Sequence, residues 1–115
     1  MKLQFKEILV RPISELVSQK KATQCTADLL IEQAVQLLRA SSVGAVVVVD
    51  GLKVLGVFTE RDLLEKVAAN GLDMAKVKIS AAMTKNPVCV QRPEPIGSVL
   101  EKMRKGNFRH VIIVD

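Results

Sequence analysis

One short segment carries most of the residues with evident chemical potential, and it reads Gly56-Val57-Phe58-Thr59-Glu60-Arg61-Asp62-Leu63. A predicted strand ends beside Thr59 and a predicted helix begins there, so these side chains lie at the open N-terminal end of a helix. Such an end presents unpaired backbone N–H groups and a positive dipole, which favour an anionic ligand. Thr59 can donate to a phosphate or ribose oxygen, and Asp62 can accept from two ribose hydroxyls. Arg61 is available for a phosphate or for a partner chain.

The spacing of Thr59 and Asp62 also has a purely structural interpretation. Thr-x-x-Asp resembles a capping box, in which each side chain satisfies a backbone N–H group at the start of the helix. The two interpretations are compatible, because an aspartate can cap an empty site and release the cap to a ribose. The spacing alone therefore leaves both a helix cap and a ligand site open at this junction.

An internal repeat surrounds this segment. Placing residues 93–115 over residues 28–50, an offset of 65, aligns five identical residues and keeps an apolar residue at several other positions. The identical pairs are Ile31 with Ile96, Arg39 with Arg104, Val46 with Val111, Val49 with Val114 and Asp50 with Asp115.

Each copy shows the same order of predicted elements, which is a short strand, an amphipathic helix and an apolar strand. The strands cover Thr23–Thr26 and Ala45–Val49 in the first copy, and Val88–Gln91 and Val111–Val114 in the second. The valine-rich runs do not alternate, so they predict strands buried on both faces. Each helix has an apolar stripe at i, i+3, i+4 and i+7. The stripes comprise Ile31, Ala34, Val35 and Leu38 in the first helix, and Ile96, Val99, Leu100 and Met103 in the second.

The first copy continues past its apolar strand. Asp50-Gly51 predicts a hairpin turn, and Lys53–Phe58 the strand that follows it. Thr59 then opens a helix to about Asn70, with Gly71 as its C-terminal stop. One complete unit is thus β-α-β-β-α. Asp28 is expected to help cap the first helix.

The domain boundaries follow from these elements. We expect an N-terminal extension at residues 1–18, a first repeat at 19–71, a linker at 72–84 and a second repeat at 85–115. Short helical turns are expected at Ile13–Val17 and Ile79–Met83. The second repeat reaches Asp115 without its turn, last strand and last helix, so we expect it to be incomplete in this chain.

The composition limits the classes of function. The net charge of +5 favours anionic partners, but the cations are spread along the chain and form no basic arm. Aromatic residues make up 3%, so stacking platforms for nucleic acid are scarce. A single histidine and two cysteines cannot complete a four-ligand zinc site of Cys and His. The sequence shows no nucleophile–base pair and no pair of carboxylates at a strand end, so we expect no enzyme.

The cysteines indicate the compartment. Cys25 and Cys89 fall in predicted strands, so we expect buried free thiols and a reducing cytoplasm. No signal peptide is evident, and the longest apolar run, Ala45–Val49, is too short to span a bilayer. The sequence therefore predicts a cytoplasmic protein without a membrane segment.

The ordered set of motifs resembles the CBS (cystathionine-beta-synthase) domain family in tandem. The Gly56–Leu63 segment is similar to its G-h-h-T-x-x-D motif, and Met83–Val88 is similar to its M-T-x-x-P-V opening. Arg109–Asp115 is similar to the R-H-h-P-V-V-D strand, although Ile112 stands in place of the proline. Gly44-Ala45 replaces the basic pair in the first repeat. The resemblance covers roughly residues 8 to 115.

This resemblance implies a fold and a class of ligand. The fold would be α+β, with two repeats packed sheet to sheet around a pseudo-twofold axis and clefts that hold AMP, ADP, ATP or S-adenosylmethionine. The family motif places ribose and phosphate contacts at Thr59 and Asp62. The resemblance also implies adenine contacts along the first strand and phosphate contacts at the R-H position. The residues concerned are Thr23, Gln24, Cys25, Arg109 and His110.

The leading hypothesis is a regulatory module that binds an adenosine nucleotide, forms a homodimer and signals to an effector protein by a shift in packing. No cofactor beyond this regulatory nucleotide is expected. A ligand-free dimerisation module is the main alternative, with Thr59 and Asp62 acting as a cap. Nucleic-acid binding is the weaker alternative, since no recognition helix is apparent. A lone histidine such as His110 is in general more often structural than a phosphate ligand.

Overall fold

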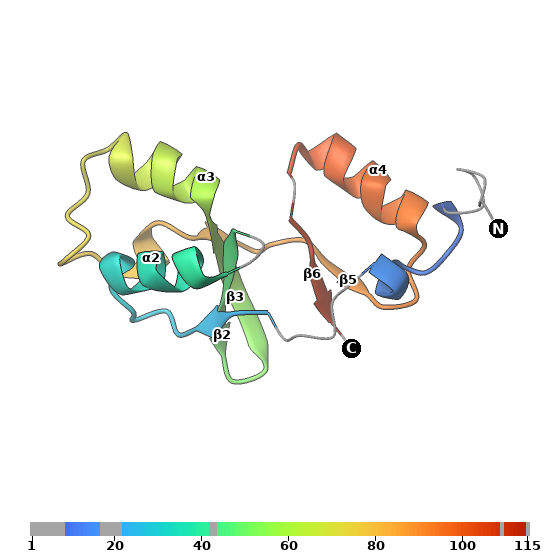
Figure 1. Ribbon diagram of the computed structural model, residues 1–115, viewed down its shortest axis with the longest axis horizontal. Coiled ribbons are helices and arrows are strands. Elements are labelled where there is room, and N and C mark those ends of the chain that lie inside the picture. Colours follow the sequence, from blue (N-terminus) through green and yellow to red (C-terminus); the bar gives the residue numbers. More distant parts are fainter. Residues whose placement is uncertain (1–8, 17–21, 42–43, 109, 115) are drawn as a thin grey trace. The chain divides into compact units, whose positions relative to one another are not determined.

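The computed structural model describes residues 9–16, 22–41, 44–108 and 110–114 (Figure 1). The chain divides into two compact units, a larger one of residues 21–87 and a smaller one of residues 1–20 and 88–115. Each unit combines helices with a β-sheet, so the α+β class is confirmed. The packing of the two sheets about a pseudo-twofold axis stays a prediction.

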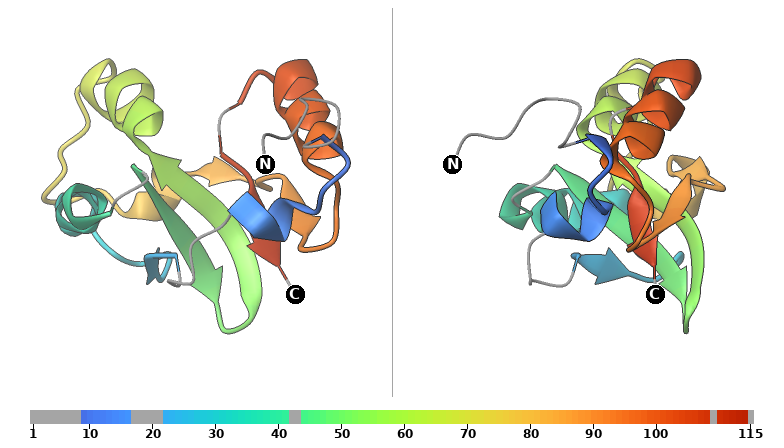
Figure 2. Two further views of the ribbon diagram at one scale, coloured as in Figure 1. Left: turned by 45° about the vertical axis from the view of Figure 1, so that its right-hand side comes forward. Right: turned by 90° about the vertical axis from the view of Figure 1, so that its right-hand side faces the viewer.

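The larger unit contains a four-stranded sheet whose strands, in spatial order, are β1 (Gln24–Cys25), β2 (Ala45–Asp50), β3 (Lys53–Thr59) and β4 (Thr84–Lys85). β1 pairs with β2 in parallel, and the other neighbours are antiparallel. Figures 1 and 2 show β2 and β3 as a twisted hairpin, which the two residues Gly51 and Leu52 close. Gly51 has a φ of 61°, which glycine adopts without the steric cost of a Cβ. The helices of this unit are α2 (Ile31–Ala40), α3 (Glu60–Asp62), the π-helix η2 (Leu63–Ala68) and the 3₁₀-helix η3 (Ile79–Ala81).

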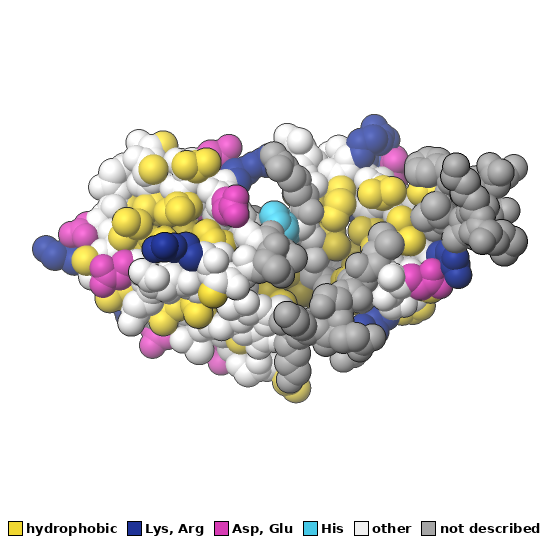
Figure 3. Space-filling model, viewed as in Figure 1, with side chains coloured by type: hydrophobic (Ala, Val, Ile, Leu, Met, Phe, Trp, Pro, Cys, Tyr) yellow, Lys and Arg dark blue, Asp and Glu magenta, His cyan; other side chains and the backbone are white. Residues whose placement is uncertain are grey.

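The core of the larger unit lies between α2 and the β2–β3 hairpin. The first four residues of β2 are buried, which confirms the strand predicted from the valine run. Phe58 on β3 is fully buried, and it packs with the predicted helix stripe. Figure 3 shows partly covered hydrophobic side chains between α2 and α3. The buried cluster comprises Ile31, Ala34, Leu38, Val46, Val48, Phe58, Val67, Ile79 and Ala82.

The smaller unit contains the 3₁₀-helix η1 (Ile13–Leu16), β5 (Cys89–Gln91), α4 (Ile96–Gly106) and β6 (Ile112–Val114). β5 and β6 form a parallel two-stranded sheet. The buried core is small and consists of Ile13, Val90, Ile96 and Val99. Along the predicted apolar stripe of α4, Ile96 and Val99 are buried, while Leu100 is 47% exposed. The sheet of the smaller unit has two strands, whereas that of the larger unit has four.

The strand register confirms the internal repeat. Gln24 lies opposite Val47 in the first sheet, and Cys89 lies opposite Ile112 in the second. Both partners shift by the same 65 residues, which is the offset that the sequence alignment uses. Each β-α-β segment therefore folds with one register, and the repeat is structural as well as sequential.

The N-terminal segment adds a 3₁₀-helix to the smaller unit, and the linker adds a matching 3₁₀-helix to the larger unit. The backbone N–H of Ile79 donates to the Leu29 carbonyl at 2.7 Å, and that of Ile13 donates to the Glu94 carbonyl at 2.7 Å. Ile13 and Ile79 begin matching 3₁₀-helices and both are buried. Residues 9–16 thus precede the first repeat in the chain but pack onto the second.

These segments also provide carbonyl oxygens to the starts of the long helices. The N–H of Ile31 donates to the Val77 carbonyl at 2.9 Å, and that of Ile96 donates to the Arg11 carbonyl at 2.8 Å. The expectation that Asp28 caps the first helix is therefore wrong, because its carboxylate accepts from Thr26 instead. Backbone carbonyl oxygens therefore accept from N–H groups at the helix starts that would otherwise need a side-chain cap.

The two cysteines differ in exposure. The two do not form a disulfide with each other, and Cys25 is half-buried on β1. Cys89 is exposed, so the expectation of a buried thiol is wrong there. Along β5 the exposed side chains of Cys89 and Gln91 alternate with buried Val90, because the sheet packs on α4 with one face. Among the described residues, no helix has the length and apolar character needed to span a membrane.

Candidate functional site

The junction of β3 and α3 forms the capping box that its spacing predicts. The Asp62 N–H donates to Thr59 Oγ1 at 3.2 Å, and the Thr59 N–H donates to Asp62 Oδ2 at 2.9 Å. The Thr59 hydroxyl itself donates to the same Oδ2 at 3.1 Å. The structural interpretation of this motif is thereby confirmed, with Oδ2 as the capping oxygen.

The second carboxylate oxygen of Asp62 belongs to a different set of contacts. Oδ1 accepts from the Thr84 hydroxyl at 2.8 Å and from the Lys66 ammonium at 2.9 Å. Lys66 also donates to the Thr84 hydroxyl at 3.1 Å. Asp62 is 3% exposed, so its charge lies away from water and these donors replace its hydration. Four donors surround a carboxylate that has about four acceptor positions.

Gly56 explains how Thr84 comes within reach of Asp62. A Cβ on Gly56 would lie 2.7 Å from the Met83 sulfur and 2.8 Å from the Thr84 carbonyl oxygen. The absence of a side chain therefore lets β4 lie close against β3, where Gly56 pairs with Lys85. The first glycine of the G-h-h-T-x-x-D segment and the threonine of the M-T-x-x-P-V segment thus belong to one cluster.

The helix after the junction is partly a π-helix, which the sequence does not predict. Leu63–Ala68 follows α3 directly, and the Ala69 N–H donates to the Leu64 carbonyl at 3.1 Å. Lys66 lies within it, four residues after Asp62. Gly71 has a φ of 61° and ends the helical segment, as predicted. π-turns inside helices are uncommon and are often found at functional sites.

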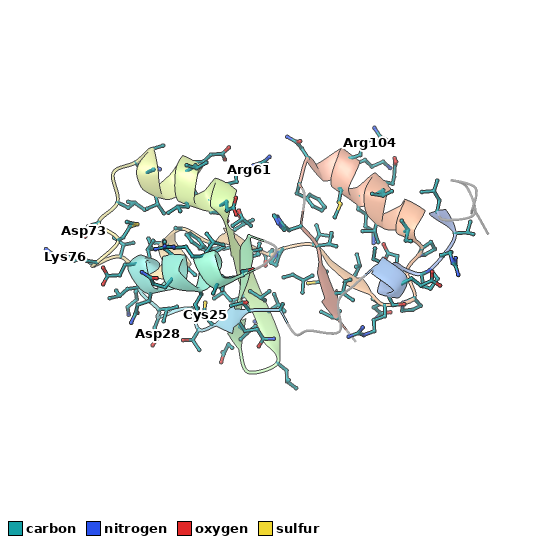
Figure 4. All side chains as sticks on the ribbon, in the orientation of Figure 1. Cys25, Asp28, Arg61, Asp73, Lys76 and Arg104 are labelled. Atoms are coloured by element: carbon teal, nitrogen blue, oxygen red, sulfur yellow. The ribbon has the colours of Figure 1, made fainter. Side chains whose placement is uncertain are left out.

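Arg61 lies on the exposed side of the same helix. Its Nε is 4.0 Å from Glu65 Oε1, one turn along, and both side chains are largely exposed. Figure 4 labels Arg61 at the start of α3. A pair of this kind contributes little to stability, because water screens it. Arg61 is therefore placed beside the Thr59–Asp62 junction but outside the buried cluster.

The predicted adenine-contacting residues lie on and beside β1. This strand is at the edge of the four-stranded sheet, so one side of its backbone faces away from β2. The Thr23 carbonyl accepts from the Val47 N–H at 2.9 Å, and Gln24 is exposed. Partial burial raises the pKa of the Cys25 thiol, and the nearby Asp28 carboxylate adds to this effect. The Thr26 hydroxyl, in turn, lowers the pKa of Asp28 by a hydrogen bond.

The basic pair predicted for phosphate contact falls in the smaller unit. Arg109 lies outside the described residues. His110 is half-buried just before β6. A joint role with Thr59 and Asp62 stays a prediction for both residues.

Lys66 and Thr84 belong to the candidate site, but the sequence analysis does not identify them as site residues. Lys66 lies four residues after Asp62, a spacing that favours helix ion pairs and could have indicated the contact. Thr84 lies 22 residues after Asp62, and its contact depends on the pairing of β4 with β3. Within the described ranges, no group of three or more His, Cys, Asp and Glu side chains could hold a metal ion.

Family comparison agrees with the fold and the motifs. The CBS domain family model matches residues 13–69 and 77–115, which together cover most of the chain. The chain belongs to the CBS domain family. The predicted resemblance is thereby confirmed, and the two matched segments correspond to two CBS repeats.

Solved structures support the CBS-pair fold. A CBS-domain containing protein from Agrobacterium tumefaciens is 38% identical, with a TM-score of 0.79 over 90% of this chain and 85% of that one. A CBS domain protein from Pyrobaculum aerophilum, complexed with AMP, is 26% identical, with a TM-score of 0.81 over 90% of this chain and 79% of that one.

A CBS domain-containing protein from Arabidopsis thaliana is 36% identical over 84 residues, which is 72% of this chain but 15% of that protein. The chain spans a small part of the curated relatives that it matches.

Proposed function

We propose that this CBS pair is a regulatory module that binds an adenosine nucleotide at the Thr59–Asp62 junction and catalyses no reaction. The observation that carries the proposal is the buried Asp62 carboxylate, held by donors from three different elements at a strand-to-helix junction. A buried carboxylate of fixed orientation suits two ribose hydroxyls, as it does in dinucleotide-binding folds. The AMP complex of the similar Pyrobaculum protein supports an adenine nucleotide as the ligand class.

The remaining contacts of the ligand follow the family motif. The edge strand β1, with Thr23, Gln24 and Cys25, would meet the adenine through its backbone. Arg61, and the Arg109-His110 pair from the second repeat, would approach the phosphates as cations or donors. The module would form a homodimer in the cytoplasm and pass the ligand-dependent change to an effector protein or domain.

Isothermal titration with AMP, ATP and S-adenosylmethionine tests this function. We expect saturable binding of at least one of the three, and a loss of about tenfold or more in affinity for Asp62→Asn. Asp62→Asn keeps an oxygen for the helix cap, and a thermal melt checks that the variant remains folded. Glu65→Gln, on the exposed side of the same helix, is the matched control and should bind like the unmodified protein. No heat from any ligand with folded protein would rule the function out.

A ligand-free structural module is the second candidate. It is favoured by the number of protein donors that already surround Asp62, which leave its carboxylate well satisfied without a ligand. In that case Asp62→Asn lowers stability, and none of the three nucleotides raises the melting temperature of either protein. The titration and the melt together separate the two candidates.

A further inference from the structure

The two oxygens of the Asp62 carboxylate have separate partners. Oδ2 accepts from Thr59 within the helix cap. Oδ1 accepts from Thr84 on β4 and from Lys66 on the following helical turn. A ribose hydroxyl could therefore claim Oδ1 while the cap at Oδ2 stays closed. The protein donors at Oδ1 are the groups that such a ligand has to replace.

These donors can leave Oδ1 at modest cost. Thr84 is exposed, and the Lys66 side chain is 41% exposed, so water can solvate both groups once they leave the carboxylate. Asp62 cannot be solvated in the same way, because it is buried. A hydroxyl from a ligand can restore the contact that Thr84 gives up, and an exchange of similar hydrogen bonds is close to neutral.

The same contact fixes β4. This strand has two residues, which pair with Gly56 and Val57 on β3. So short a strand gains much of its order from the Thr84–Asp62 hydrogen bond and the bridging Lys66. The chain runs from β4 through Asn86 and Pro87 into β5, the first strand of the second repeat.

We infer that Lys66 and Thr84 form a displaceable latch on Asp62. A ribose hydroxyl opens this latch by replacing their contacts with Oδ1, and the loss of these contacts loosens β4. The inference rests on the proposed nucleotide function, and it assigns the transmitting element. Lys66 and Thr84 are positioning residues that compete with the ligand for Oδ1. Release of β4 carries the change into the segment that joins the two repeats.

The test compares Thr84→Val and Lys66→Met with the unmodified protein. Thr84→Val removes the hydroxyl and suits an exposed strand position, and Lys66→Met removes the charge at similar length. Lys85→Met is the matched control, because it removes the neighbouring cation on β4, whose backbone pairs with Gly56. AMP affinity is measured by titration calorimetry, and hydrogen exchange of the amides in residues 83–87 is measured with and without saturating AMP.

The latch predicts that Thr84→Val binds AMP about tenfold more tightly, because the ligand no longer displaces a hydrogen bond to a charged group. Lys66→Met should also bind more tightly, and Lys85→Met should be unchanged. AMP should speed exchange in residues 83–87 of the unmodified protein, and Thr84→Val should show fast exchange without AMP. A lost structural contact alone would weaken binding, so tighter binding is specific to the latch.

Other results would contradict the latch. If the unmodified protein binds AMP and Thr84→Val binds it equally or less tightly, the latch is wrong while the nucleotide function stands. If neither protein binds AMP, the latch and the nucleotide function fail together. This outcome is distinguishable from failure of the latch alone, because in that case the unmodified protein still binds AMP.

Discussion

Alanine at position 13 is expected to destabilise the smaller unit by about 2–5 kcal/mol, the usual cost of truncating a buried isoleucine. Ile13 is buried against Val90, Ile96 and Val99, and these four residues make up the buried core of that unit. Removing one of four core side chains leaves a cavity that so small a unit cannot readily close. Residues 9–16, which look like a dispensable extension, should therefore be essential to the second repeat.

Amide signals of the two units, followed by NMR during urea denaturation, measure this effect. Signals of Val90 and Val99 should disappear at lower urea in Ile13→Ala, while those of Val46 and Val48 should shift less. Val10→Ala is the control in the same segment, because Val10 is 74% exposed and should cost little. A change below about 0.5 kcal/mol for Ile13→Ala would show that the N-terminal segment does not complete the second core.

The second large effect is expected from Asp62→Ala, at about 2–4 kcal/mol of unfolding free energy. The change removes the Asp62 half of the capping box, in which Oδ2 accepts from the Thr59 N–H, and breaks the partly buried ion pair with Lys66. The cost stays below that of a fully buried pair because the Lys66 ammonium can reach water once it is released. Thr84 also loses its acceptor, so β4 should loosen with the helix.

Urea denaturation of Asp62→Ala checks this value against Glu65→Ala. Glu65 lies on the same helix and makes a long exposed pair with Arg61, so its removal should change stability by less than about 0.5 kcal/mol. Equal stability of the two variants would mean that the Asp62 contacts hold neither the helix start nor β4.

Local patterns predicted much of this fold. The valine run of β2 is buried as its lack of alternation indicates, because a strand covered on both faces needs no polar side. The Thr59–Asp62 cap is also a local contact within one helical turn, so its geometry follows from spacing. The internal repeat could also be recognised from local patterns, because each β-α-β segment has its own helix stripe and its own strands.

Contacts between distant segments were not predictable in this way. Ile13 precedes the first repeat in the chain but packs onto the second, and no local pattern indicates this long-range contact. The matching turns that begin at residues 13 and 79 share little sequence beyond Ile-Ser. The contact of Thr84 with Asp62 depends on the pairing of β4. Leu100 fits a helix stripe in sequence, yet it is 47% exposed, because burial depends on tertiary packing that the stripe does not specify.

Chemical-shift mapping with AMP on isotope-labelled protein tests the central claim most directly. The nucleotide function predicts saturable shifts of the Thr59 and Asp62 amides, with smaller shifts at Gln24 and Cys25 on β1 and at Thr84 on β4. Saturable shifts confined to other residues, or none at millimolar AMP in a folded sample, would contradict the assignment of this junction as the nucleotide site.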